Sequence, residues 1–374
     1  MPFATNIYRL GVKELWSLAR DPVMLVLIAY TFTISIYIAA TAMPDTLHKA
    51  PIAIVDEDGS PLSARIASAF FMPHFNPPAM ISLSAMDVGM DNGDYTFVLD
   101  VPPDFQRDVL AGKSPTLQFN VDATRMTQAF TGSSYVQQMV TDEVNEFVAH
   151  YRNITPPPVE LVLRERFNPN LEQSWFGALM EVINNVTMLS IILTGAALIR
   201  ERELGTIEHL LVMPVTPFEI MLAKIWSMGL VVLVAATIAL LVMVQGILRV
   251  PIEGSIALFL LGAALHLFAT TSMGIFMATL ARSMPQFGIL TVLILLPMQL
   301  LSGGFTPRES MPGFVQHLML FAPTTHFVAL GKAILFRGAG LTVVWPQFLA
   351  LIAIGAAFFA IALTRFRKTI SEMA

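Results

Sequence analysis

The sequence predicts a polytopic α-helical membrane protein with six transmembrane helices and a soluble α/β domain between the first and second helices. Of its 374 residues, 55% are hydrophobic and only 13% are charged. Soluble domains carry about 25% charged residues, so this low share, with a mean hydropathy of +0.66, argues against a globular protein. The apolar residues gather in runs of roughly bilayer length, which one long acidic stretch interrupts.

The first 42 residues predict a surface helix followed by a membrane crossing. Residues 1–22 mix cationic and apolar side chains, which indicates an amphipathic N-terminal helix on the cytoplasmic membrane surface. Asp21 and Pro22 supply an N-cap and a first-turn proline. The apolar run 23–42 has the roughly 20 residues that a crossing needs, more than the about 7–15 of a secretory signal. We therefore expect an uncleaved first transmembrane helix.

The stretch 43–172 has a different character, because it carries 17 acidic and 8 basic residues and lacks an apolar run of bilayer length. Short β-rich runs alternate with helical patterns, which predicts an α/β domain of ordinary size. The predicted strands are Ile52–Val55, Tyr95–Leu99, Thr116–Val121 and Val159–Leu163, and the predicted helices begin at Pro61, Pro103 and Arg125.

Residues 173–374 hold the other five predicted crossings, at 176–199, 218–245, 255–280, 286–302 and 343–364. Thr216 and Glu219 form a capping box that starts the third crossing, and the same pattern recurs at Thr306 and Glu309. The segment 303–340 is apolar, but prolines and histidines interrupt it. We expect it to form interfacial or re-entrant helices between the fifth and sixth crossings.

Lysine and arginine near the crossings predict the orientation of the chain. With a cytoplasmic N-terminus, ten of these residues lie inside and four outside, so both termini are cytoplasmic and the α/β domain is extracytoplasmic. The inner set is Arg9, Lys13, Arg20, Arg200, Arg202, Lys224, Arg282, Arg365, Arg367 and Lys368; the outer set is Arg249, Arg308, Lys332 and Arg337.

The densest run of charge, residues 200–214, follows the second crossing. At 3.6 residues per turn, Leu204, Ile207 and Leu211 share one face. Such a helix would lie in the membrane surface and end at Pro214. A solvated connector helix is the plain alternative.

This run reads R-E-R-E-L-G-T-I-E-H-L-L-V-M-P, and it resembles the signature of ABC-2 type transporter permeases, R-E-R-E-x-G-T-x-E-x-L-L-x-x-P. The resemblance extends over essentially the whole chain and is strongest to exporters of the bacterial inner membrane. It implies the ABC-2 permease fold and a coupling helix at 200–214 that docks on a separate ATP-binding subunit. The residues expected to couple to that ATPase are Arg202, Glu203, Thr206, Glu208, His209 and Pro214.

The same resemblance implies the partners and the cofactors. Two permease copies, or this chain and a homologous permease, would form a dimer, and a membrane-fusion adaptor protein would contact the 43–172 domain. ATP and Mg²⁺ would bind to the partner ATPase. The sequence has no G-x-x-x-x-G-K-[ST], H-E-x-x-H or G-x-S-x-G pattern, and its seven histidines show no metal-ligand spacing. We therefore expect a transport subunit rather than an enzyme.

Four polar residues in the predicted crossings are candidates for a substrate path: Glu181, Asn184 and Asn185 in the second, and Gln299 in the fifth. The alternative for the first three is a carboxylate at headgroup depth with hydrogen bonds between helices. Two other functions also remain open. One is an exporter that an ion gradient drives, and the other is a membrane-anchored sensor that uses the extracytoplasmic domain.

Overall fold

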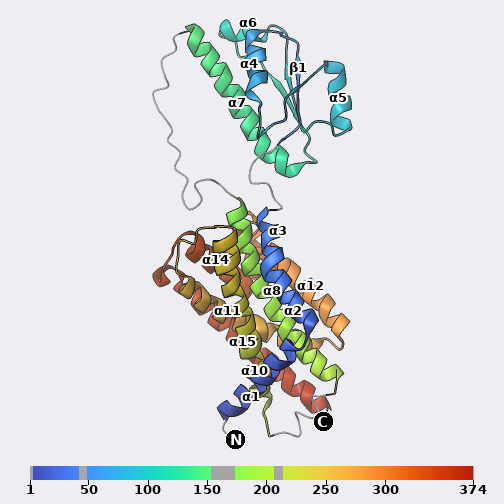
Figure 1. Ribbon diagram of the computed structural model, residues 1–374, viewed down its shortest axis with the longest axis vertical. Coiled ribbons are helices and arrows are strands. Elements are labelled where there is room, and N and C mark those ends of the chain that lie inside the picture. Colours follow the sequence, from blue (N-terminus) through green and yellow to red (C-terminus); the bar gives the residue numbers. More distant parts are fainter. Residues whose placement is uncertain (1–2, 42–48, 153–172, 206–213, 374) are drawn as a thin grey trace. The chain divides into compact units, whose positions relative to one another are not determined.

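The computed structural model describes residues 3–41, 49–152, 173–205 and 214–373, which form two compact units (Figure 1). The helical unit contains the described residues of Met1–Met43 and Glu165–Ala374. The α/β unit contains those of Pro44–Arg164. Each unit has its own hydrophobic core.

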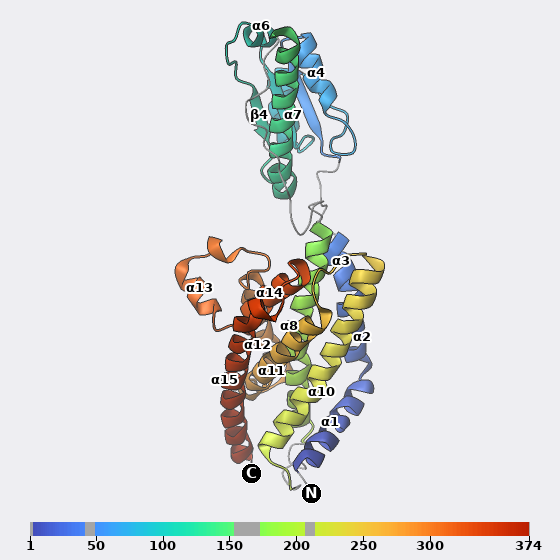
Figure 2. The ribbon, with the colours of Figure 1, turned by 90° about the vertical axis from the view of Figure 1, so that its left-hand side faces the viewer.

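The helical unit begins with α1 (Phe3–Ala19), which lies along α10 (Pro217–Ile238) in both views (Figures 1 and 2). Asp21 caps the next helix by accepting a 3.2 Å hydrogen bond from the Met24 amide, as predicted. The apolar segment Pro22–Thr41 then comprises α2 (Pro22–Tyr30), the π-helical η1 (Thr31–Ser35) and α3 (Ile36–Thr41).

Five helical segments among the described residues are long and apolar enough to cross a membrane. They are Pro22–Thr41, α8 (Gln173–Glu203), α10 with the π-helical η2 (Ala239–Ile247), α11 (Ile256–Leu280) and α15 (Leu341–Met373). The fifth predicted crossing corresponds to α12 (Met284–Leu300), an apolar helix of 17 residues. The protein is thus a polytopic helical membrane protein with five or six candidate crossings.

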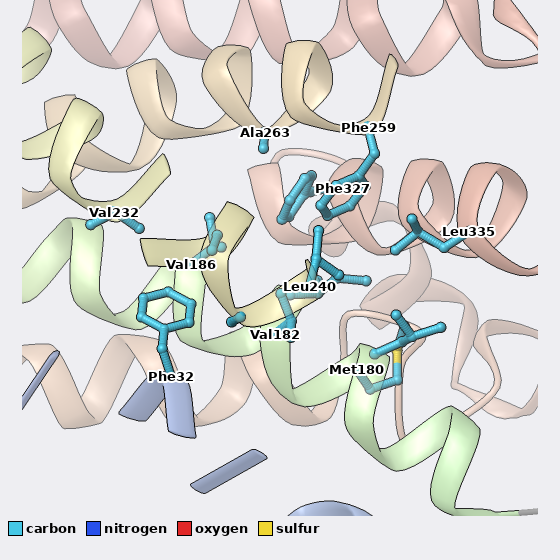
Figure 3. Packing of buried hydrophobic residues seen from close by; sticks show 14 of the residues in the cluster. Phe32, Met180, Val182, Val186, Val232, Leu240, Phe259, Ala263, Phe327 and Leu335 are labelled. Carbon is cyan, nitrogen blue, oxygen red and sulfur yellow. The ribbon is translucent and has the colours of Figure 1, made fainter. Parts of the chain in front are cut away.

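Helix α8 lies at the centre of the helical unit. In its most apolar window 78% of the residues are buried, compared with 22% in Pro22–Thr41. Its Met180, Val182 and Val186 join side chains from α11 and α14 in the main core (Figure 3). Helices α8 and α11 approach so closely that a Cβ on Gly274 would lie 2.7 Å from a carbonyl oxygen of α8. Close approach through small residues is typical of membrane helix packing.

The segment between α12 and α15 is broken, so it is not a straight crossing. It contains η3 (Arg308–Ser310), α13 (Gly313–Met319), α14 (Pro323–Gly331) and η4 (Lys332–Phe336), and α13 meets α14–η4 at 88°. The capping box predicted at Thr306 is wrong, because only a short 3₁₀ turn forms there. Pro312 lacks the amide that an α-helix would need to bond the Arg308 carbonyl. The capping box predicted at Thr216 is confirmed.

The α/β unit holds a four-stranded sheet in the order β2-β1-β3-β4. Strand β1 (Ile52–Asp56) pairs in parallel with β2 (Ala79–Ile81) and β3 (Phe97–Val101), and β4 (Gln118–Val121) is antiparallel to β3. Three of the predicted strands are confirmed with shifted ends, and the fourth, Val159–Leu163, lies outside the described residues.

Helices cover both faces of this sheet. Helices α4 (Pro61–Ala69), α6 (Phe105–Leu110) and α7 (Met126–Arg152) pack on one face, and α5 (Leu83–Asp91) packs on the other. Strand β2 and helix α5 were not predicted. The strand has only three residues and follows the prolines at 77 and 78, which do not favour a strand.

Candidate functional site: a charged junction at the end of α8

The charged run that carries the signature begins inside α8. Arg200 to Glu203 complete the last turn of that helix, and the chain then turns at Gly205, which has a φ of +67°. A glycine in this left-handed conformation is the usual helix terminator. The first four residues of the predicted coupling helix 200–214 thus belong to α8, and its residues 206–213 lie outside the described part of the chain. Thr206, Glu208 and His209 lie outside the described residues, and Pro214 is exposed.

The first residue of the run, Arg200, binds the turn between α1 and α2. Its guanidinium forms an ion pair with the Asp21 carboxylate. Burial acts to raise the pKa of Asp21, but the Met24 amide and Arg200 outweigh it and hold the pKa below its ordinary value. Asp21 therefore stays charged at neutral pH and holds the start of the first crossing against α8.

The second residue, Glu201, belongs to a buried ionic network with α1 and α10. Lys224 Nζ lies 2.7 Å from Glu201 Oε2 and 3.0 Å from Glu14 Oε1, and Lys13 also pairs with Glu201. The side chains of Lys224, Glu14 and Glu201 are only 2%, 7% and 10% exposed. Two cations and two carboxylates balance, which is what allows charges to be buried.

Lys13 closes this network on its solvent side. Burial acts to lower the pKa of Lys13, but the Glu201 carboxylate and then Glu14 outweigh it, so the pKa lies above its ordinary value. Its side chain is 48% exposed, whereas Lys224 is enclosed. Lys13 therefore keeps its positive charge at neutral pH.

The third and fourth residues of the run bind the two helices that follow. Arg202 donates to the carbonyls of Ala278 and Ala281 at the C-terminus of α11, where a cation interacts favourably with the helix dipole. Glu203 accepts a 2.8 Å hydrogen bond from the Met284 amide, which starts α12. An anion is correspondingly favoured at a helix N-terminus.

We call this set of residues the charged junction: Arg200, Glu201, Arg202 and Glu203 with Lys13, Glu14, Asp21 and Lys224. Each of its four signature side chains binds a different part of the helical unit. A cavity of about 200 Å³ adjoins it, lined by Lys13, Glu14, Arg200 and Glu201 and by apolar side chains of α1, α2, α8 and α10. Movement of the end of α8 would therefore reach α1, α2, α10, α11 and α12 together.

The structure brings two of the predicted substrate-path residues together against the first crossing. Glu181 accepts a hydrogen bond from the Ser35 hydroxyl, and Asn185 donates at 2.8 Å to the Thr31 carbonyl, both in the π-helical η1. Asn184 is 9% exposed. Gln299 lies on a different helix, α12, where its backbone carbonyl accepts a hydrogen bond from the Ser302 hydroxyl.

A ladder of buried polar side chains joins α8 to α11 below these residues. Thr187 bonds the His266 ring at 2.8 Å, and Ser190 donates to Thr270 at 2.6 Å. The His266 ring also stacks on Phe327 at 4.1 Å. These groups hold helices together. In the part of the chain that the structure describes, no cluster of three or more His, Asp or Glu residues could hold a metal ion.

The helical unit is a bundle of apolar helices whose ends meet the R-E-R-E run in the charged junction. An α/β unit is inserted after the first candidate crossing. This architecture is that of an integral membrane permease. The chain belongs to the ABC-2 family of transporter proteins, because the profile of that family matches residues 22–364. It is similar to the inner membrane transport permease YhhJ of Escherichia coli K12, with 64% identity over 369 residues and 99% of each chain covered.

A more distant relative has the printed name probable multidrug ABC transporter permease YbhR, also from Escherichia coli K12. It is 28% identical over 368 residues, covering 98% of this chain and 99% of that protein. Both relatives are named as transport permeases, and YhhJ as one of the inner membrane. With its several apolar helices, the chain is therefore a multi-pass inner membrane protein and a transport subunit.

Sequence reasoning missed the network around Lys224, although a signal for it was present. Lys224 is a lysine inside an otherwise apolar helix, and Glu14 lies on the inner face of α1. An ionisable group at such a position indicates a specific partner. The partners could not be assigned without the fold, because they lie 210 and 23 positions away in the chain.

Proposed function

We propose that this chain is the transmembrane permease subunit of an ABC-2 type exporter. It moves a hydrophobic or amphipathic small molecule out of the cytoplasm or the inner membrane, and ATP hydrolysis in a separate ATP-binding subunit drives it. The charged junction carries the proposal, since it joins five helices immediately before the segment expected to meet the ATPase. The family and the printed name of YbhR support an exporter of this kind.

The proposed topology has six crossings, with α12 as the fifth and the bent pair α13–α14 at the interface or re-entrant. Both termini are cytoplasmic and the α/β unit is extracytoplasmic. The distribution of Lys and Arg supports this orientation. The charged junction then lies at the cytoplasmic surface, on the side of the membrane where ATP is available.

We divide the residues of the signature into those that dock on the ATPase and those that transmit its movement. Thr206, Glu208, His209 and Pro214 are the proposed docking residues for the ATPase. Arg202 and Glu203 have partners inside the chain, so we assign them to transmission: they carry movement of the docked segment to α11 and α12. An ATPase that binds this segment differently in its ATP and ADP states would bias two arrangements of the helices.

The proposed assembly is a dimer of permeases with two ATP-binding subunits. A periplasmic adaptor that contacts the α/β unit is a further proposed partner. Glu181, Asn184, Asn185 and Gln299 are the proposed residues of the substrate path. The hydrogen bonds of Glu181 and Asn185 to the first crossing support this substrate path, because the path would change shape when α8 and the first crossing move.

One experiment separates this proposal from an exporter that an ion gradient drives and from a sensor. The complex is purified in mild detergent, and the amount of co-purifying ATPase is compared between Glu208→Lys and a control, Glu253→Lys. Glu253 lies in the loop before α11. We expect Glu208→Lys alone to lose the co-purifying ATPase. Export that continues after the ATPase is deleted, with the proton gradient kept, would refute the proposal.

A further inference from the structure

The half-buried carboxylate of Glu181 differs from the buried carboxylates of the helical unit. Glu14 and Glu201 face Lys224, and Glu219 serves as the capping-box partner of Thr216. Among the residues that the structure describes, Glu181 forms no ion pair, and its hydrogen-bond donor is the neutral Ser35 hydroxyl. A carboxylate at membrane depth without a cation is unusual.

The contact with Ser35 fixes the depth of Glu181. The Asp21–Arg200 pair marks one level of both helices near the inner boundary. At 1.5 Å per residue, Ser35 lies about 21 Å and Glu181 about 28 Å along its helix from that level. Both values are within the roughly 30 Å of a hydrocarbon core. Glu181 and its donor Ser35 therefore lie toward the outer end of the candidate crossings, within the length of one hydrocarbon core.

Glu181 lies on an accessible strip in the middle of the central helix. Between residues 178 and 196 α8 is buried except at Glu181, Met188 and Ile192, which are half-buried, and their spacing of seven and four places them on one face. Helix α8 contacts both α3 and α12. The strip thus combines flexible apolar surface, including a methionine, with a single anionic group.

Among the described cations, Lys332 in η4 contacts α8 but is directed away from Glu181. Its Nζ lies 5.1 Å from the centre of the Phe176 ring and donates to the Gly303 carbonyl. Phe176 and Glu181 are five positions apart, which separates them by about 140° around the helix. Lys332 therefore does not neutralise the strip.

We propose that Glu181 makes this strip a binding site for lipophilic organic cations, such as quaternary ammonium or phosphonium ions and protonated amphipathic amines. The apolar part of such a molecule covers Met188 and Ile192, and its charge pairs with the Glu181 carboxylate, to which no residue in the described part of the chain supplies a cation. This inference rests on the proposed export function and names the class of cargo.

Two ions of the same size and opposite charge provide the test, tetraphenylphosphonium and tetraphenylborate. Their binding to the permease in lipid nanodiscs is measured by equilibrium dialysis, with protein-free nanodiscs subtracted. The wild type is expected to bind the cation in preference to the anion. Glu181→Gln, which retains an acceptor for Ser35, is expected to weaken cation binding roughly tenfold or more, as for a lost charged contact.

Two further variants serve as controls for this test. Glu181→Asp keeps the charge and is expected to keep the preference for the cation, whereas Glu253→Gln removes a carboxylate outside the crossings and should change nothing. Equal binding of both ions to the wild type, or an unchanged cation affinity in Glu181→Gln, would overturn the inference.

A transport assay distinguishes failure of this inference from failure of the proposed function. The complete complex is reconstituted in vesicles, and ATP-dependent movement of tetraphenylphosphonium and of a neutral hydrophobic dye is followed. If neither probe moves with ATP, the proposed function fails. If the wild type and Glu181→Gln move both probes equally well with ATP, the export function stands and the cation site is refuted.

Discussion

Replacement of Lys224 by Met separates the structural role of the buried ionic network from its role in coupling. Lys224 is enclosed between Glu14 and Glu201, and no other described side chain could replace it, since Lys13 is on the solvent side. Methionine has nearly the same length and no charge. Lys224→Met therefore leaves the packing intact and leaves one excess buried negative charge.

The structure allows an estimate of the cost. Removing one partner of a buried ion pair costs about 3–5 kcal/mol, and the remaining Lys13 favours the low end, about 3 kcal/mol. A domain of 150–250 residues loses about 2–4 °C of melting temperature per kcal/mol, so we expect a decrease of about 6–12 °C. The double variant Lys224→Met/Glu14→Leu leaves Lys13 with Glu201 and restores the balance. It should melt within about 3 °C of the wild type, since balanced apolar replacement is nearly neutral.

The assay is thermal unfolding of the purified permease, followed by ATP hydrolysis and transport of the complex. If the network transmits movement, the double variant is stable and its complex hydrolyses ATP, but transport per ATP falls at least fivefold. A double variant less stable than Lys224→Met would refute the charge-balance argument. Normal transport per ATP in the double variant would refute the transmission role of this network.

Three other predictions follow from contacts in the helical unit. Arg202→Gln removes the cation at the C-terminus of α11, and we expect ATP hydrolysis by the complex to continue while transport per ATP falls. Asp21→Asn should lower the melting temperature at pH 7, and the difference should close below about pH 4. The charged form of a carboxyl with a depressed pKa stabilises the fold above the unfolded pKa of about 3.9, and this stabilisation is lost as the pH falls through the folded pKa. Gly274→Val places a Cβ 2.7 Å from a carbonyl oxygen of α8 and should cost about 1–3 kcal/mol in the same melting assay, whereas Gly288→Ala, where the added atom meets open space, should not destabilise.

The parts of the fold that the sequence predicted are those that depend on neighbours along the chain. Apolar runs located the crossings, and Thr216 with Glu219 located the start of α10. The same local reasoning failed at Thr306, where the pattern was identical but Pro312 prevented an α-helix. A capping box specifies a helix only when the residues one turn later can continue it.

The candidate site could be located but not understood from the sequence. The R-E-R-E run was recognisable, but the family resemblance assigned Arg202 and Glu203 to contact with the ATPase. The structure shows both side chains bound within the chain, to α11 and α12. Periodicity reports which residues share a face of one helix, and it gives no information about which distant helix covers that face.

The density of charge in the signature has a physical explanation in this geometry. A helix end that must move several others needs contacts that survive small displacements, and long charged side chains keep their partners over a range of distances better than close apolar packing does. Arg200, Arg202 and Glu203 bind an aspartate, two carbonyls and an amide that all belong to helix ends. Around Lys224, in contrast, the charges are enclosed and fixed. The junction thus combines a rigid contact with α1 and α10 and adjustable contacts with α2, α11 and α12, so a pull on α8 would carry the first pair with it and reorient the other three.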